Sequence, residues 1–272
     1  MAKRRLDTLL AERGLFPSRT RAAASVMAGE VRVGSNGRRA AKPGELVDDA
    51  EQLTVQAAAP FVSRGGIKLA NALAATRLPV RGRRALDVGA STGGFTDCLL
   101  QAGAAEVIAV DVAYGTLDYR LRNDPRVIVM ERTNARSLAS SLLPRAAQRG
   151  EQLPDLATID VSFISLAKVL PAVLACLQPR YDVLALVKPQ FEVGRERVGK
   201  GGVVRDAGHR RAALTEVGQA ALALGAAVHG YVPSGLPGPK GNLETFIWLS
   251  DPGRGGTRAV AALENLVVEA EP

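Results

Sequence analysis

Two polar residues directly follow apolar runs of strand length: Asp160 ends one run and Lys188 ends the next. Glu244 opens a third run, and Lys68 lies on a predicted helix that begins near Ser63. A lysine amine becomes an effective base when burial or a second cation disfavours its charged form, and a carboxylate can orient it. The four residues therefore suit proton removal from a weak nucleophile such as a ribose hydroxyl. Two ordinary surface ion pairs would use the same residue types.

The elements that must position these residues alternate between strands and helices from residue 83 onward. Predicted strands cover 85–88, 107–110, 127–130, 156–161 and 183–187, and helical segments lie near 95–102, 137–147, 164–177 and 208–224. This alternation predicts an α/β fold, a Rossmann-like parallel sheet with helices on both faces. Asp160 and Lys188 would then emerge at the same carboxyl edge. Glu244 joins them if residues 227–232 and 245–249 form an antiparallel hairpin.

A glycine-rich turn follows the first of these strands and opens a helix. Ser91 stands where a dinucleotide-binding motif has its second glycine, and Asp111 follows Gly89 by 22 residues. An acid at that distance can accept hydrogen bonds from ribose hydroxyls. The pattern predicts S-adenosylmethionine, a nucleoside without phosphates, although the glycines could merely form a tight turn. The predicted cofactor contacts are Asp87, Gly89, Ala90, Ser91, Thr92, Gly93, Gly94, Asp111, Asn134 and Asp160.

Two further residues near this predicted site have open interpretations. Asn134 could donate a hydrogen bond to adenine or could cap its own loop. Phe163 could pack beside a target nucleoside or lie in the core.

Positive charge is concentrated at the start of the chain. Residues 1–42 hold ten Lys and Arg against three acids, so they carry nearly all of the net charge of +8. Such a surface is typical of a polyanion binder, although it could also be a solvated basic face. The predicted RNA contacts are Arg4, Arg5, Arg13, Arg19 and Arg21, with Lys200 on a later glycine-rich loop. With few aromatic residues nearby, binding would depend on phosphates and shape.

The basic segment has the pattern of a small folded α+β domain. Leucines at helical spacing begin it, and Ser18 is a plausible N-cap for a helix over 19–28 that Gly29 ends. Short strands are predicted at 31–33 and 53–55, with a turn at Asn36-Gly37. This arrangement resembles the RNA-binding fold named after the fourth small-subunit ribosomal protein.

Composition excludes several classes of protein. The 272 residues are 47% hydrophobic, which excludes a disordered chain. No apolar run approaches the roughly 20 residues that cross a bilayer, and no secretory signal is visible. Two widely spaced cysteines suit a reducing cytoplasm, and the two histidines lack metal-ligand spacing, so we expect a cytoplasmic protein without a metal.

Six segments in order resemble the hemolysin-A family of ribosomal RNA methyltransferases: 63–69, 86–95, 131–136, 160–166, 187–192 and 241–246. The resemblance implies an N-terminal RNA-binding domain (1–56), a linker (57–63) and an FtsJ-like, class I methyltransferase domain (64–268). It implies a catalytic tetrad of Lys68, Asp160, Lys188 and Glu244, hereafter the tetrad. It further implies 2′-O-methylation of cytidine in ribosomal RNA, with ribosomal subunits as partners and a link to capreomycin susceptibility. A monomer is expected.

Three other functions remain as alternatives. The chain could be a non-catalytic RNA-binding or ribosome-assembly factor, or a membrane-active haemolysin as the family name suggests. The absence of a long apolar segment argues against the haemolysin. A base methyltransferase would need a catalytic cysteine or an Asn/Asp-Pro-Pro-type motif, and residues 160–163 supply neither.

Overall fold

The computed structural model describes residues 3–55, 59–139, 143, 153–257 and 259–271. Contacts divide the chain into two compact units, Met1–Ala59 and Pro60–Pro272. Each unit has its own apolar core. The units are therefore described separately.

The N-terminal unit has the predicted helices and strands. Helix α1 (Leu6–Glu12) packs against α2 (Arg19–Ala28). Ser18 caps α2 by accepting a hydrogen bond from the Arg21 amide, and Gly29 ends it with φ of 80°. Strand β1 (Lys3–Arg5) pairs with β4 (Leu46–Asp48), and β2 (Val31–Val33) lies between β3 (Arg38–Arg39) and β5 (Leu53–Val55). The α+β prediction is confirmed.

The second unit is built on a seven-stranded sheet in the order β11-β12-β10-β9-β6-β7-β8. Five neighbouring strands are parallel: β10 (Asp182–Val187), β9 (Leu156–Ile159), β6 (Arg84–Val88), β7 (Glu106–Val110) and β8 (Val127–Met130). Strands β11 (Ala227–Pro233) and β12 (Thr245–Ser250) form the expected antiparallel hairpin. The Rossmann-like sheet is confirmed.

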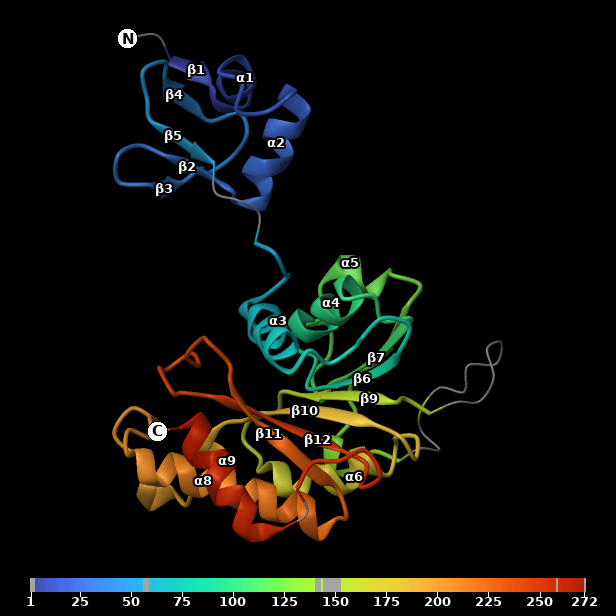
Figure 1. Ribbon diagram of the computed structural model, residues 1–272. Helices are drawn as coiled ribbons and strands as arrows, with labels where there is room; N and C mark the ends of the chain where they lie inside the picture. The colour runs from blue at the N-terminus through green and yellow to red at the C-terminus, as the bar shows by residue number, and fades with distance from the viewer. Residues whose placement is uncertain (1–2, 56–58, 140–142, 144–152, 258, 272) are drawn as a thin grey trace. The chain divides into compact units, whose positions relative to one another are not determined.

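Helices cover both faces of this sheet (Figure 1). One face packs against α3 (Arg64–Thr76), α4 (Gly94–Gln101) and α5 (Tyr119–Arg122). The other packs against α6 (Leu170–Leu174), α8 (Ala207–Ala223) and α9 (Val260–Ala270). Along β6, Ala85 faces the core beneath α3 and α4, whereas Leu86 and Val88 face the core beneath α6, α8 and α9. Both faces must be apolar because both are buried.

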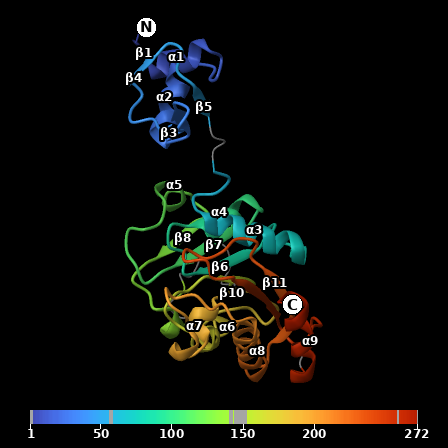
Figure 2. The ribbon, with the colours of Figure 1, turned by 90° about the vertical axis from the view of Figure 1, so that its left-hand side faces the viewer.

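Short elements complete the carboxyl edge of the sheet. Within the described residues, 3₁₀ turns cover Ala135–Ser137, Leu166–Lys168 and Arg195–Arg197, and helix α7 (Pro189–Glu192) directly follows β10. Figure 2 shows α7 on the same side of the sheet as α6 and α8. These elements surround the strand ends that carry the polar residues singled out above.

Two predicted boundaries differ from the structure, and a third predicted element is only partly described. Phe61 and Val62 pack against the core that contains α3, so residues 60–63 belong to the second unit and not to a linker. The strand predicted to reach residue 161 ends at Ile159, which leaves Asp160 just beyond it. Most of the helix predicted over 137–147 lies outside the described residues, and residues 135–137 form a 3₁₀ turn.

Candidate active site

Strand register brings the tetrad to one edge of the sheet. Val187 pairs with Thr245 in the antiparallel β10–β12 ladder, so Lys188 and Glu244 are neighbours just beyond it. Ile159 pairs with Val88, which places Asp160 beside Gly89. Polar residues that follow buried parallel strands meet at such an edge.

The tetrad forms two lysine–carboxylate pairs. Lys68 Nζ contacts Glu244 Oε2, and both side chains are almost fully buried. Lys188 Nζ lies 2.5 Å from Asp160 Oδ1, in a pair whose side chains are 12% and 24% exposed. The second pair is thus the one open to a reactant. A surface ion pair, the simpler interpretation, does not describe the deeply buried pair of Lys68 and Glu244.

Two cavities meet at the tetrad. Cavity A, of about 470 Å³, is lined by all four tetrad residues together with residues 63–65 and much of the glycine-rich turn. Cavity C, of about 360 Å³, is lined by Lys188, Glu244 and the aromatic side chains of Phe163 and Phe191. Lys188 and Glu244 line both cavities, so a group in A can meet a group in C beside these two residues.

The glycine-rich turn lies against cavity A because its small residues allow close approach. Gly89 has φ of 88°, and a side chain there would collide with the Asp160 carbonyl oxygen, 2.5 Å from its Cβ position. A Cβ on Gly94 would collide with Ser63 Oγ and the Gly66 amide. Lining residues of cavity A from the turn are Gly89, Ala90, Ser91, Thr92 and Gly94. Gly93, with φ of 96°, forms the turn without lining the cavity.

Asp111 belongs to a third cavity, cavity B, of about 590 Å³. Its two carboxylate oxygens accept hydrogen bonds from the amides of Ser91 and Ala113, at 2.7 Å each. These bonds hold the carboxylate at the cavity wall and leave lone pairs for a ligand, since each oxygen can accept twice. Cavity B also shares Gly89, Ser91 and Asp160 with cavity A, so A and B form one continuous lining.

The position of Asp87 corrects its prediction as a cofactor contact. Its side chain is completely buried behind the glycine-rich turn and lines none of the three cavities. It accepts hydrogen bonds from Thr96 Oγ1 at 2.6 Å and Thr158 Oγ1 at 3.1 Å. Burial raises the pKa of Asp87 to about 7, although the two hydroxyls oppose this. The residue therefore joins α4 to β6 and β9 and supports the turn from below.

The structure also resolves the open interpretations of Asn134 and Phe163. Asn134 lines cavity B and its side-chain oxygen caps a 3₁₀ turn through the Arg136 amide, so the loop-cap interpretation holds and its amide NH₂ remains as a donor. Phe163 is 91% exposed, with φ of 64°, and its ring lies 5.1 Å from that of Phe191. Core burial of Phe163 was wrong.

Sequence reasoning missed several residues that the fold brings to the site. Ser162 lines cavities B and C, and its Oγ accepts a hydrogen bond of 3.1 Å from Lys188 Nζ. Glu192 accepts a hydrogen bond of 2.9 Å from the Leu166 amide, and burial raises its pKa. The available signals were the position of Ser162, two residues after Asp160, and the place of Ser162 and Glu192 in the segments 160–166 and 187–192.

Most of the predicted RNA-contacting arginines have partners within the N-terminal unit. Arg5 and Arg19 both bind the buried carboxylate of Asp7, at 2.8 and 3.1 Å. Their pairing, led by the Arg5 hydrogen bond, holds the pKa of Asp7 well below its usual range. Arg4 pairs with Glu12 and Asp49, and Arg13 donates to the carbonyls of Asp49 and Glu51.

The remaining predicted RNA contacts lie on exposed segments. Arg21 is exposed and forms no ion pair with the described residues. Lys200 is exposed on the loop that a bridge between Gly199 and Val203 closes, and Gly202 of this loop lines cavity C.

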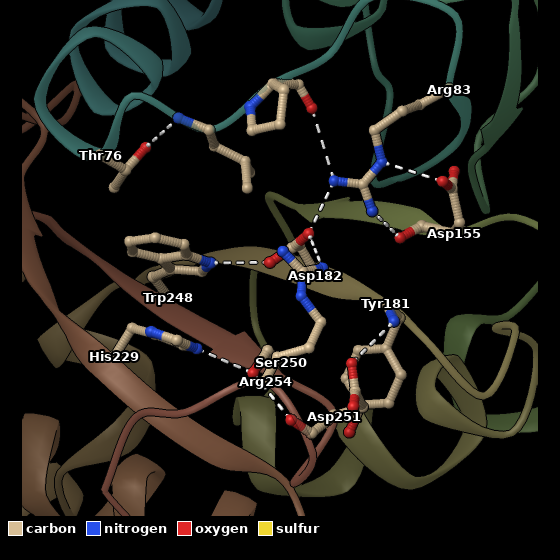
Figure 3. Close-up of polar contacts among 12 residues, drawn as sticks. Thr76, Arg83, Asp155, Tyr181, Asp182, His229, Trp248, Ser250, Asp251 and Arg254 are labelled. Atoms are coloured by element: carbon tan, nitrogen blue, oxygen red, sulfur yellow. Dashed lines mark hydrogen bonds and ion pairs between the residues drawn. The ribbon is translucent and has the colours of Figure 1, made fainter.

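A buried ion network lies at the opposite end of β10 from Lys188 (Figure 3). The Asp182 carboxylate, with no exposed surface, accepts from Arg83 and Arg254 at 2.6 Å each and from Trp248 Nε1 at 3.1 Å. Arg83 also binds Asp155. These contacts join β10 to β12 and to the segments before β6 and β9.

Two absences concern only the part of the chain that the structure describes. Within it, no group of three or more His, Cys, Asp or Glu could hold a metal ion. None of its helices is both long and apolar enough to span a bilayer.

Comparison with known proteins shows the family of the chain. A family model described as FtsJ-like methyltransferase matches residues 61–251, and one described as S4 domain matches residues 4–53. The chain is 50% identical to the 16S/23S rRNA (cytidine-2′-O)-methyltransferase TlyA of Mycobacterium tuberculosis, over 92% of this chain and 91% of that protein. It is 36% identical to Hemolysin A of Brachyspira hyodysenteriae, over 88% and 97%.

A solved structure extends this likeness to nearly the whole chain. A hemolysin-type protein of Streptococcus thermophilus is 41% identical, with a TM-score of 0.71, over 99% of this chain and 96% of that one. The FtsJ-like match alone covers well over half of the sequence. The chain belongs to the FtsJ-like methyltransferase family, in the hemolysin-A group that joins this domain to an S4 domain.

Proposed function

We propose that this protein transfers the methyl group of S-adenosylmethionine to the ribose 2′-hydroxyl of cytidine in ribosomal RNA. The observation that carries the proposal is the pair of lysine–carboxylate contacts where cavities A and C meet. The names of the relatives from Mycobacterium tuberculosis and Campylobacter jejuni specify cytidine 2′-O-methylation of rRNA. Action on ribosomal RNA would place the protein in the cytoplasm.

Cavities A and B fit the cofactor. Their shared lining at Gly89 lacks side-chain bulk, and the fixed Asp111 carboxylate provides acceptors of the kind that ribose hydroxyls use. Asn134 retains a donor for the purine. When bound, S-adenosylmethionine supplies an electrophilic methyl group on a positively charged sulfur.

Cavity C suits the acceptor nucleoside. It opens beside Lys188, and the exposed ring of Phe163 stands on its wall, supported by Phe191. Aromatic side chains stack unpaired bases in RNA-modifying enzymes. A ribose held here would present its 2′-hydroxyl to the Lys188 amine.

The reaction needs only one proton transfer by the protein. The Lys188 amine at this position would take the 2′-hydroxyl proton, and S-adenosylmethionine, once bound, would supply the methyl group that the ribose oxygen accepts. The Asp160 carboxylate then faces a lysine ammonium, which it stabilises at 2.5 Å. Lys68, held by buried Glu244, contributes positive charge beside the reacting oxygen.

The N-terminal unit supplies RNA affinity. Its arginines, several of them held in fixed positions by acids and carbonyls, offer donors to phosphates. Lys200 adds an exposed cation on the loop between Gly199 and Val203, whose Gly202 lines cavity C.

The proposal is tested with ribosomal subunits from cells that lack this gene. The purified protein and methyl-labelled S-adenosylmethionine should label the RNA of one or both subunits. Absence of label despite cofactor binding would favour a binding or assembly factor instead. Lysis of erythrocytes by the pure protein would be needed to support a haemolysin.

A further inference from the structure

We propose that Ser162 is a positioning residue that sets the direction of the Lys188 amine. The inference deepens the proposed function and rests on it, because it assumes that Lys188 is the base. Ser162 lies two residues beyond Asp160, on the segment that follows β9, and its Oγ is 3.1 Å from Lys188 Nζ. It lines cavities B and C but does not belong to the tetrad.

The contact with Ser162 is directional, whereas the contact with Asp160 is not. Asp160 Oδ1 is only 2.5 Å from Lys188 Nζ, yet this oxygen forms no hydrogen bond of acceptable angle with any described residue. The carboxylate therefore attracts the hydrogens of the amine without forming a well-directed hydrogen bond. Ser162 Oγ accepts a hydrogen bond from the same nitrogen and so fixes rotation about the last side-chain bond.

The tetrahedral geometry of the Lys188 amine nitrogen explains why rotation about the last side-chain bond matters. A neutral amine has two hydrogens and one lone pair, and only the lone pair can take a proton. With one N–H directed to Ser162 and the second drawn toward Asp160, the remaining position is left for the acceptor hydroxyl. A general base works only when its acceptor position lies within hydrogen-bond reach of the proton.

The segment that carries Ser162 is fixed to the helix that follows Lys188. The ring of Phe163 packs on that of Phe191, and Glu192 accepts a hydrogen bond from the Leu166 amide at 2.9 Å. Both partners belong to α7, which directly follows Lys188. Ser162 and the amine are thus attached to one local unit, so their distance can persist while RNA enters and leaves.

Lys68 has no equivalent of this arrangement. Its amine contacts Glu244 in a buried pair, and no hydroxyl donates to or accepts from it among the described residues. A charge that only stabilises the transition state must lie close to the reacting atoms, but the N–H bonds of the amine need not point in one particular direction. The difference between the two lysines matches their different roles in the reaction.

The test compares Ser162→Ala and Ser162→Thr with Ser165→Ala. The Ser165 hydroxyl caps the turn at 166–168 through the Ala167 amide, hydrogen-bonds Glu192 and does not touch the amine, so its loss perturbs the same segment and its attachment to α7 without the proposed role. We expect Ser162→Ala to lower kcat about tenfold, while KM for RNA and Kd for S-adenosylmethionine change less than about twofold.

The pH profile gives the second readout. Removing an acceptor disfavours the lysine ammonium, so the ascending limb of kcat should move to lower pH in Ser162→Ala. Ser162→Thr, which keeps the hydroxyl, should restore both kcat and the limb, and Ser165→Ala should leave the limb in place.

Three results would overturn the inference: wild-type kcat and pH profile in Ser162→Ala, the same pH shift in Ser165→Ala, or no rescue by threonine. Failure of the proposed function would look different, because the wild-type protein would then not methylate the ribose, or Lys188→Ala would retain methyl transfer.

Discussion

Lys188 and Asp160 follow neighbouring parallel strands, and their side chains meet with Nζ 2.5 Å from Oδ1. The antiparallel register of β12 then adds Glu244 beside Lys188, and α3 brings Lys68 to Glu244. The sheet topology and helix α3 thus bring together residues 68, 160, 188 and 244, which are far apart in the sequence. The following predictions test what this arrangement does.

Removing the proposed base should stop turnover while the cofactor still binds. We expect Lys188→Ala to lower kcat by about 10²-fold or more, the usual contribution of a general base. Kd for S-adenosylmethionine, measured by calorimetry, should change little. Lys188→Arg is the matched control: it keeps a charge but cannot lose it, and should be equally inactive. An active arginine variant would show that charge alone suffices.

Removing the Asp111 carboxylate should weaken cofactor binding. Its oxygens lie at the wall of cavity B, held by the amides of Ser91 and Ala113. We expect Asp111→Ala to raise Kd for S-adenosylmethionine about tenfold, as for the loss of a charged hydrogen bond. Asp124→Ala, which removes an acid paired with Arg126, is the control and should leave Kd unchanged. Equal effects of both variants would contradict the assignment.

Replacing Arg19 and Arg21 together should weaken RNA binding. Arg21 is exposed, and Arg19 is held by Asp7 in a fixed direction. Loss of about two phosphate contacts should reduce the slope of log K against log salt by roughly 1.5 to 2. Arg126→Ala, in the second unit, is the control for lost charge. Unchanged affinity and slope in the double variant would exclude this helix as an RNA contact.

The Asp7 carboxylate should stabilise the N-terminal unit in a pH-dependent way. Because Arg5, with help from Arg19, lowers its pKa in the folded state, the contribution is complete above the unfolded pKa of about 3.9 and is lost as pH falls below it. We expect Asp7→Asn to cost about 1 kcal/mol at pH 7, because the arginines are exposed to solvent. Hydrogen exchange of the α1 and α2 amides in the full chain measures this. A cost as large at pH 2 as at pH 7 would contradict the mechanism.

The Asp182 network should be important for stability and not for chemistry. Its carboxylate has no exposed surface and binds two arginines (Figure 3). Asp182→Ala would leave both guanidinium groups without it, at a cost of about 3–5 kcal/mol. We expect the thermal midpoint of the second unit to fall by roughly 10 °C. A midpoint within 2 °C of wild type would show that the arginines find other partners.

The strands, and the sheet edge that carries the tetrad, could be predicted from the sequence. Both faces of a parallel sheet are apolar, so the polar residues Asp160 and Lys188 were conspicuous at the strand ends. The distances between the tetrad side chains could not be predicted. Nothing in the order of residues showed that Asp87 would lie beneath the turn, since its burial depends on Thr96 and Thr158 from other elements. Likewise, Phe163 is exposed because its backbone turns into the left-handed region, a local conformation that residue type does not favour.

The prediction of which basic side chains contact RNA was the least complete. The sequence prediction treated Arg5 and Arg19 as RNA contacts without an internal partner, yet Asp7 pairs with both. An acid close in space to basic residues reduces their net field and fixes their direction at the same time. Such pairing depends on tertiary contacts that composition does not reveal.

The central claim is that the methyl group goes to a cytidine ribose and that Lys188 prepares the hydroxyl. The direct measurement is mass spectrometry of nucleosides and nuclease fragments from subunits treated with wild-type protein or with Lys188→Ala. The account predicts 2′-O-methylcytidine with wild-type protein and none with the variant. A methyl group on the base, or the same ribose product from Lys188→Ala, would contradict it.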